Sequence, residues 1–95
     1  ELEPRVARRE EAVQVEFGTQ ARVKVERLES FIAAEGASLS DVIKTTIFLP
    51  DFANYQGMNE VYREYFSDQP PARATVGAKL VRDEWLVEIE ALAVV

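Results

Sequence analysis

The sequence has 95 residues, of which 47% are hydrophobic and 29% are charged, a composition typical of one soluble globular domain. With 11 basic and 17 acidic side chains the net charge is −6, which repels a phosphate backbone and argues against binding to nucleic acid. Cys and His are both missing from the sequence, which excludes disulfides, thiolate chemistry, imidazole bases and the usual zinc sites. Catalysis would therefore use carboxylate, guanidinium, hydroxyl or backbone groups.

The chain carries no apolar run near the roughly 18 residues of a membrane span, and its first residues, ELEPRVARREE, lack the apolar core of a signal peptide. We therefore expect a cytoplasmic protein that does not enter a membrane. The sequence begins with Glu1 rather than Met, which indicates a processed or truncated form. A domain of this size buries only about 60 to 70% of its unfolded surface, which favours association with copies of itself.

The first 16 residues are ambiguous. They mix Arg and Glu with a short alternating patch at Val13 and Val15, and fit a tail, a short edge strand or the remnant of a longer element. Residues 19–35 predict a helix, because the apolar side chains recur at spacings of four, three and four and Gly36 follows as a C-terminal cap. The members of that apolar face are Ala21, Val25, Leu28 and Ile32.

Residues 42–49 are β-branched and aromatic and end at Pro50, which predicts a strand. A second helix is expected after Asp51, with Gly57 as a weak point. Its apolar face comprises Tyr55, Met58 or Asn59, Tyr62 and Phe66. Residues 72–78 and 85–95 predict two more strands, joined by a turn at VRDE. The order α-β-α-β-β predicts an α/β sandwich, in which two helices pack on one face of a small mixed sheet.

Both faces of the last predicted strand are mostly apolar. Alternation places one set of side chains together, Trp85, Val87, Ile89, Ala91 and Ala93, and a second set on the other face, Leu86, Glu88, Glu90, Leu92 and Val94. Two carboxylates about 7 Å apart among apolar residues need a raised pKa or a cation. Arg73 is the expected cation, since a hairpin would lay its strand beside the last one. A guanidinium is also suited to binding a small carboxylate.

Simpler interpretations remain open at this point. Arg73 fits a solvated charge or half of a surface salt bridge, and Glu88 and Glu90 fit a face turned toward water or a neighbouring subunit. The tyrosines Tyr55, Tyr62 and Tyr65 fit the packing of the second helix better than a stacking platform, and Thr45 and Thr46 fit ordinary strand positions. Residue patterns alone predict a small α/β domain with a candidate acid/base pair.

Four motifs occur in the order and spacing of a known family: GASLSDVIKTTIFL, NEVYREYF, PPARATV and VEIEA. With the helix sequence TQARVKVERLESFIAAEGAS, residues 16–95 resemble the Rid family, the YjgF-like reactive-intermediate imine deaminases. The resemblance implies one domain over residues 1–95, with residues 1–15 poorly matched. It also implies a chorismate-mutase-like α/β fold that assembles as a homotrimer, with ligand pockets in the clefts between subunits.

The resemblance assigns roles to individual residues. The family's substrate-binding arginine corresponds to Arg73 and its catalytic glutamate to Glu88, and we expect Thr75 and Glu90 to contact the substrate as well. Arg73 would pair with the carboxylate of a 2-imino or enamine acid, and Glu88 would activate a water that attacks the C=N carbon. The products would be a 2-oxo acid and ammonia, with no metal or organic cofactor.

The sequence departs from the family pattern in three places. Thr75 replaces a frequent Cys, the turn LVRDEW lacks the usual Pro, and residues 1–15 do not match the usual N-terminal strand hairpin. Residues 13–17 are the candidates to cover the strand edges that such a hairpin would occupy. Three functions follow: an imine/enamine deaminase, a non-catalytic or regulatory module that binds small carboxylates, and, disfavoured by the net charge, a ribonuclease or translation inhibitor.

Overall fold

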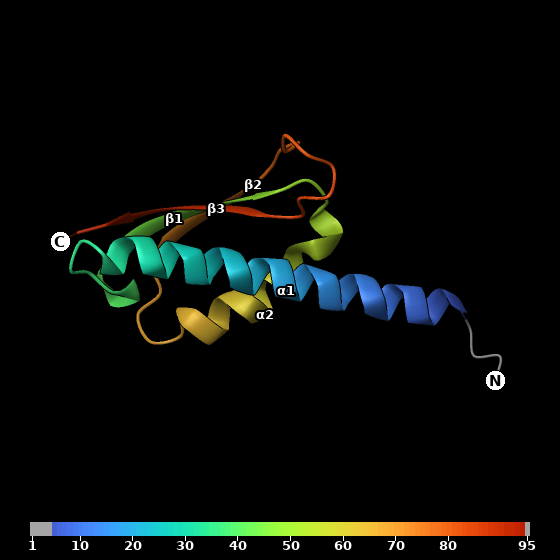
Figure 1. Cartoon of the computed structure of the whole chain (residues 1–95), viewed down its shortest axis with the longest axis horizontal. Helices are drawn as coiled ribbons and strands as arrows, with labels where there is room; N and C mark the ends of the chain where they lie inside the picture. The colour runs from blue at the N-terminus through green and yellow to red at the C-terminus, as the bar shows by residue number, and fades with distance from the viewer. Residues whose placement is uncertain (1–4, 95) are drawn as a thin grey trace.

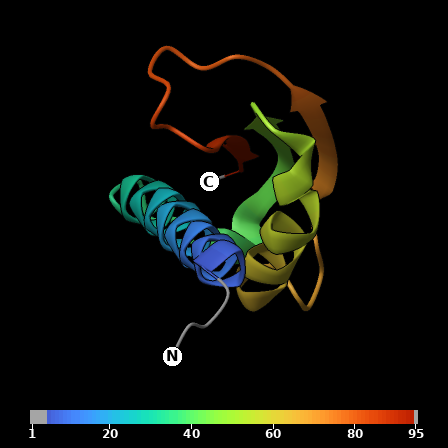
Figure 2. The same ribbon diagram turned by 90° about the vertical axis from the view of Figure 1, so that its right-hand side faces the viewer.

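The computed structural model describes the backbone of residues 5–94 and the side chains of residues 16–94. The chain folds as a helix layer against a sheet layer (Figure 1). Helices α1 (Arg5–Ala33) and α2 (Tyr55–Tyr65) both lie on one face of the sheet, as the end-on view in Figure 2 shows. The expectation of an α/β sandwich with two helices on one face of a small mixed sheet is confirmed.

Helix α1 begins far upstream of the predicted start at residue 19. The alternating Val13 and Val15 suggested a strand, but the surrounding Arg, Glu, Ala and Gln are strong helix formers, and the backbone from Arg5 is helical. The alternative of a short edge strand in this segment is therefore wrong, and the buried Phe17 packs into the core. The N-terminal part of α1 extends beyond the sheet (Figure 1).

The end of α1 is built as the sequence predicted. Gly36 has a φ of +84°, a backbone conformation that is strained for any residue with a Cβ. Two backbone amides at this turn donate hydrogen bonds back to carbonyls of the helix. Gly36 N donates to Ala33 O at 3.0 Å, and Ala37 N donates to Ile32 O at 3.0 Å. These two bonds form a Schellman motif, which satisfies carbonyls that the helix end would leave without partners.

The sheet has three strands in the order β2-β1-β3. Strand β1 (Val42–Leu49) is central, pairing in parallel with β2 (Ala72–Gly77) and antiparallel with β3 (Glu88–Ala93). A short 3-10 turn, Phe52–Asn54, leads into α2, and the Asp51 carboxylate accepts a hydrogen bond from Ala53 N at 2.9 Å. Helix α2 is the crossover that a parallel β1–β2 pair requires.

The prediction that the last two strands form a hairpin is wrong, because β2 and β3 do not pair with each other. Residues 78–87 carry the chain past β1, so that β3 pairs with the opposite edge of β1 from β2. The last strand also begins at Glu88 instead of residue 85. Its predicted beginning bonds to α1 instead, because the Gln20 side chain accepts from Leu86 N and donates to Glu84 O, both at 2.9 Å.

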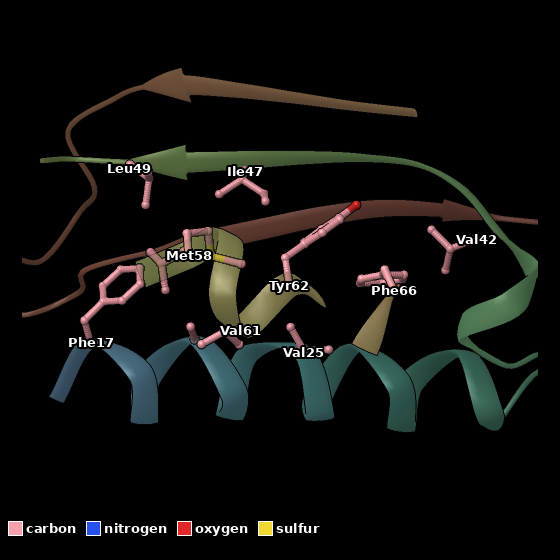
Figure 3. Packing of buried hydrophobic residues seen from close by; sticks show 11 residues of the cluster. Phe17, Val25, Val42, Ile47, Leu49, Met58, Val61, Tyr62 and Phe66 are labelled. Carbon is pink, nitrogen blue, oxygen red and sulfur yellow. The ribbon is translucent and has the colours of Figure 1, made fainter. Parts of the chain in front are cut away.

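The core lies between β1 and the two helices (Figure 3). Most of the predicted apolar faces are confirmed, but Leu28 lies outside the buried cluster, Ile32 is only partly buried and Tyr55 is 45% exposed. The buried side chains are Phe17, Ala21 and Val25 from α1, Met58, Val61, Tyr62 and Phe66 from α2 and its end, Val42, Ile47 and Leu49 from β1, and Val87. Ile89, Ala91 and Ala93 pack against this cluster, which confirms their shared face.

An ion pair on the surface joins the two helices. Arg22 donates from Nε and Nη2 to the two carboxylate oxygens of Glu64, at 2.9 and 2.6 Å. The hydrogen bond and the positive charge of Arg22 lower the pKa of the Glu64 carboxyl. One turn along α1, Glu26 accepts from the Tyr65 hydroxyl at 3.1 Å, and burial together with this bond raises the pKa of Tyr65. At the surface, the contact between α1 and α2 is therefore made by polar and charged side chains, in contrast to the apolar core beneath it.

Candidate functional site

Arg73 lies on β2 and points toward α2. Its backbone aligns with Thr45 of β1, whose side chain is fully buried beneath the helices, so the guanidinium leaves the same face of the sheet. The guanidinium carbon lies 4.8 Å from the centroid of the Tyr62 ring and 5.7 Å from that of Tyr55. Both distances are those of cation–π contacts, which favour a cation over an aromatic face.

The floor of this site is a buried hydrogen bond. Thr45 Oγ1 and the Tyr62 hydroxyl are 2.7 Å apart, and both side chains are buried. The bond fixes the ring on which the guanidinium rests. Tyr62 therefore packs the helix against the sheet, as the periodicity predicted, and also supports Arg73. Thr45 is more than an ordinary strand residue, because it sets the position of that ring.

Two polar side chains orient the guanidinium. Nη2 donates to Asn59 Oδ1 at 2.6 Å, and Nε donates to Thr75 Oγ1 at 3.1 Å. Arginine has five N–H donors, so three remain, two on Nη1 and one on Nη2. Among the side chains of residues 16–94 no carboxylate forms an ion pair with Arg73. Within the described residues, both Nη1 and Nη2 therefore keep N–H donors that no side chain uses, and a carboxylate can accept from two such nitrogens in bidentate form.

Asn59 is a site residue that the sequence interpretation placed only as an alternative core position. It opens the NEVY motif of α2, and the presence of an amide on an otherwise apolar helix face is the signal that could have identified it. Thr75 was expected near the substrate because it shares a strand face with Arg73. In the structure its hydroxyl contacts Arg73 directly.

Glu88 lies at the other edge of the sheet. It aligns with Phe48, whereas Arg73 aligns with Thr45, so the two residues are three positions apart along β1 and on opposite faces. Because β1 separates their strands, they are also about 10 Å apart across the sheet. The cation beside Glu88 is Lys24 of α1, whose Nζ lies 3.1 Å from Oε1. The expectation that Arg73 pairs with Glu88 through a hairpin is therefore wrong within one chain.

Glu90 is exposed on the sheet face that the helices do not cover. It aligns with Thr46 of β1 and shares this face with Glu88, as the alternation predicted. A hollow of about 240 Å³ lies here, lined by Lys44, Thr46, Glu90, Ala91 and Leu92. The structure does not bring Glu90 to Arg73 in one copy. Several apolar side chains on this side of the sheet and its ends are exposed, including Ile43, Leu92 and Val94.

A family model described as Endoribonuclease L-PSP matches residues 3–95, which is nearly the whole chain. This chain belongs to that family, the YjgF-like or Rid family. A crystal structure of a Mycobacterium tuberculosis member of the YjgF family has a TM-score of 0.80 and 32% identity, covering 83% of this chain and 68% of its own. The α/β fold of the present chain is thus the fold of the YjgF family.

Two relatives illustrate the sequence similarity. A RutC family protein of Pyrococcus horikoshii is 41% identical over 83 residues, which cover 87% of this chain and 66% of the relative. The 3-aminoacrylate deaminase RutC of Acinetobacter baylyi is 41% identical over 74 residues, which cover 78% of this chain and 59% of the relative. The chain therefore spans less than two thirds of the length of each of these YjgF-family relatives.

Two further observations concern the described part of this YjgF-family chain. Within residues 5–94 neither helix combines the length and apolar character that crossing a bilayer requires. A second hollow, of about 560 Å³, lies beside the carboxyl ends of β1 and β2, where Phe52, Lys79 and Trp85 are among its lining residues. It contains neither Arg73 nor Glu88, so the two residues assigned by the family motifs lie outside it.

Proposed function

We propose that this chain hydrolyses reactive 2-imino and enamine acids to the corresponding oxo acids and ammonia. The observation that carries the proposal is the Arg73 guanidinium, which rests on Tyr62, is oriented by Asn59 and Thr75, and keeps N–H donors on both Nη1 and Nη2 that no described side chain uses. A planar carboxylate is the ligand that such a pair of donors fits best. The relative named 3-aminoacrylate deaminase supports the class of substrate, because 3-aminoacrylate is an enamine acid.

The proposed chemistry needs a clamp and a base. Arg73 holds the substrate carboxylate, which fixes the neighbouring C=N carbon next to a water molecule. Glu88 accepts a proton from that water as the oxygen attacks the carbon. The same carboxyl returns this proton to the nitrogen, which gives a carbinolamine. It then transfers the hydroxyl proton of the carbinolamine to the same nitrogen as the C=O bond forms and the C–N bond breaks, so that ammonia leaves and Glu88 is again a carboxylate. An enamine acid enters this sequence as its imine tautomer. Water is the only co-reactant, so this scheme uses no cofactor.

We propose that the complete site forms between copies of the chain, in a homotrimer. Arg73 and Glu88 lie at opposite edges of the sheet and on opposite faces, so one copy cannot place them around one substrate. Arg73 of one copy beside Glu88 of the next would do so. Exposed apolar side chains at the helix-free face, such as Leu92 and Val94, support association through that face.

Two other functions remain as alternatives. A module that binds small carboxylates without hydrolysing them would use the same Arg73 clamp. Arg73 and Glu88 are far apart within one chain, so a chain that stays monomeric would favour this binding module over the hydrolase. The family description names an endoribonuclease, which would need affinity for RNA. The net charge of −6 opposes that affinity, because binding to a phosphate backbone depends on cationic side chains.

The test is hydrolysis of 2-iminopropanoate, generated by an amino-acid oxidase acting on alanine and trapped competitively with semicarbazide. The wild type should accelerate the loss of the imine, whereas Arg73→Ala should not, and Glu88→Gln should be strongly impaired. Arg63→Ala is the matched control, because Arg63 is an exposed arginine on the last turn of α2 and should retain wild-type activity.

Other outcomes would select an alternative. If the wild type fails to accelerate imine loss but binds 2-oxobutanoate in calorimetry, and Arg73→Ala does not bind, then the chain is a carboxylate-binding module. Binding of RNA that weakens steeply with salt, together with cleavage, would favour the ribonuclease. Sedimentation of the wild type as a monomer in the presence of full activity would contradict a site shared between copies.

A further inference from the structure

Two side chains on consecutive turns of α1 hold the segment that leads into β3. The first is Gln20, whose amide forms two hydrogen bonds with the backbone. Gln20 Nε2 donates to Glu84 O, and Gln20 Oε1 accepts from Leu86 N, both at 2.9 Å. Both ends of the amide are therefore used, and the path of residues 84–86 is fixed against the helix directly before Glu88.

Lys24, four residues after Gln20, reaches the carboxylate itself. Its Nζ donates to Glu88 Oε1 at 3.1 Å and lies 5.4 Å from the centroid of the Trp85 ring. The Lys24 side chain is 23% exposed, so it is well covered for a lysine. An ammonium held by both an aromatic ring and a carboxylate has less freedom than one in an ordinary surface ion pair.

These contacts use one oxygen of the Glu88 carboxylate and leave the other available. Among the side chains of residues 16–94, Lys24 is the partner of Oε1, and Oε2 has no hydrogen bond. A charge-assisted bond to one oxygen restricts rotation of the carboxylate and so fixes the direction of the other. A base that accepts a proton from a bound water needs this kind of fixed direction.

We propose that Lys24 is a positioning residue, which holds Glu88 through Oε1 so that Oε2 faces the attacking water. This inference rests on the proposed hydrolysis and adds a residue to which the resemblance assigns no role. Lys24 does not contact the substrate in this scheme, and Arg73 remains the carboxylate clamp. The effect of Lys24 therefore falls on the rate of the chemical step, while substrate binding is left to Arg73.

The test compares three variants in the imine assay. Lys24→Met removes the ammonium but keeps an unbranched side chain, and kcat should fall about tenfold while KM stays within about twofold. Lys24→Arg keeps a cation and should recover most of the lost kcat. Arg22→Met is the control, because Arg22 lies on the same helix and its ion pair with Glu64 is remote from Glu88. Its kcat should equal that of the wild type.

Several results would overturn the inference. Wild-type kcat in Lys24→Met would do so, as would an equal loss in Arg22→Met, which would indicate a general effect of disturbing α1. A crystal structure gives a readout that does not depend on turnover. The Glu88 carboxylate should occupy one conformation in the wild type and several in Lys24→Met. One unchanged conformation in both would refute the positioning role, whereas an inactive wild type would refute the proposed hydrolysis.

Discussion

The buried hydrogen bond between Thr45 and Tyr62 provides a quantitative test of how the Arg73 site is supported. The two oxygens are 2.7 Å apart, Thr45 is fully buried and Tyr62 is 5% exposed. Tyr62→Phe removes one hydroxyl and leaves the other in an apolar environment. The ring stays in place, so the aromatic face beneath the guanidinium is retained.

The expected cost follows from the unsatisfied partner. A buried polar group that loses its hydrogen bond destabilises a protein by about 1–3 kcal/mol. Tyr62→Phe and Thr45→Val should each therefore lower the free energy of unfolding by about 2 kcal/mol. The double variant removes both polar groups and keeps their shapes, so we expect its free energy of unfolding to lie within about 1 kcal/mol of the wild type.

Urea unfolding followed by circular dichroism measures all four proteins. With an m-value of about 1 kcal/mol/M, each single variant should lower the urea midpoint by about 2 M. A double variant that loses the sum of the two single effects would refute the reasoning, because the hydroxyls would then contribute independently. Binding of 2-oxobutanoate to Tyr62→Phe should persist, since the guanidinium keeps its aromatic support.

Three further predictions concern single residues. Asn59→Asp places a carboxylate against Arg73 Nη2, so binding of 2-oxobutanoate, measured by calorimetry, should weaken at least about tenfold, whereas unchanged affinity would contradict the clamp. Gly36→Ala should lower the free energy of unfolding by about 1–2 kcal/mol, because a Cβ is strained at a φ of +84°, and an unchanged urea midpoint would argue against the cap. Arg22 lowers the pKa of Glu64, so their pair stabilises the fold above the ordinary Glu64 pKa of 4.5, and this contribution is lost as the pH falls through the lowered pKa. The difference in unfolding midpoint between wild type and Glu64→Gln should thus be present near pH 7 and vanish at about pH 2; a difference that does not change with pH would exclude this linkage.

The elements of the fold were largely readable from local patterns. Apolar spacing of three and four located the buried faces of both helices, including Ala21, Val25 and Met58. A β-branched run located β1, and Gly36 marked the end of α1 because few other residues adopt its backbone conformation. Each of these signals arises within a few residues of chain, which is why the sequence is sufficient to read them.

The N-terminal half of α1 shows where local signals conflict. Val13 and Val15 alternate as in a strand, but the charged residues around them favour a helix, and the short apolar pattern could not decide between the two. The predicted start of the last strand at residue 85 was wrong for a different reason. Backbone groups of residues 84–86 bond to the Gln20 side chain, a partner 64 to 66 positions away that a strand pattern does not reveal.

The candidate site shows the same division. Family motifs in the sequence nominated Arg73, Thr75, Glu88 and Glu90 as candidates, but they did not indicate which side chains surround each one. The contacts of Arg73 with Asn59 and Tyr62 depend on α2 packing over β2, and the contact of Lys24 with Glu88 depends on α1 packing beside β3. Helix periodicity marked Tyr62 as core, and only its neighbours revealed it as the support of a cation.

By itself, the sequence of this protein determined the class of fold, the apolar faces, the helix cap and the residues that carry the family motifs. Tertiary structure decided that β1 lies between β2 and β3, and therefore that Arg73 and Glu88 leave opposite edges of one sheet. Strand order depends on which long-range backbone hydrogen bonds form and which apolar faces they bury together. The alternation of side chains along a strand does not depend on which strand pairs with it. Periodicity in the sequence therefore does not indicate the order of strands in the sheet.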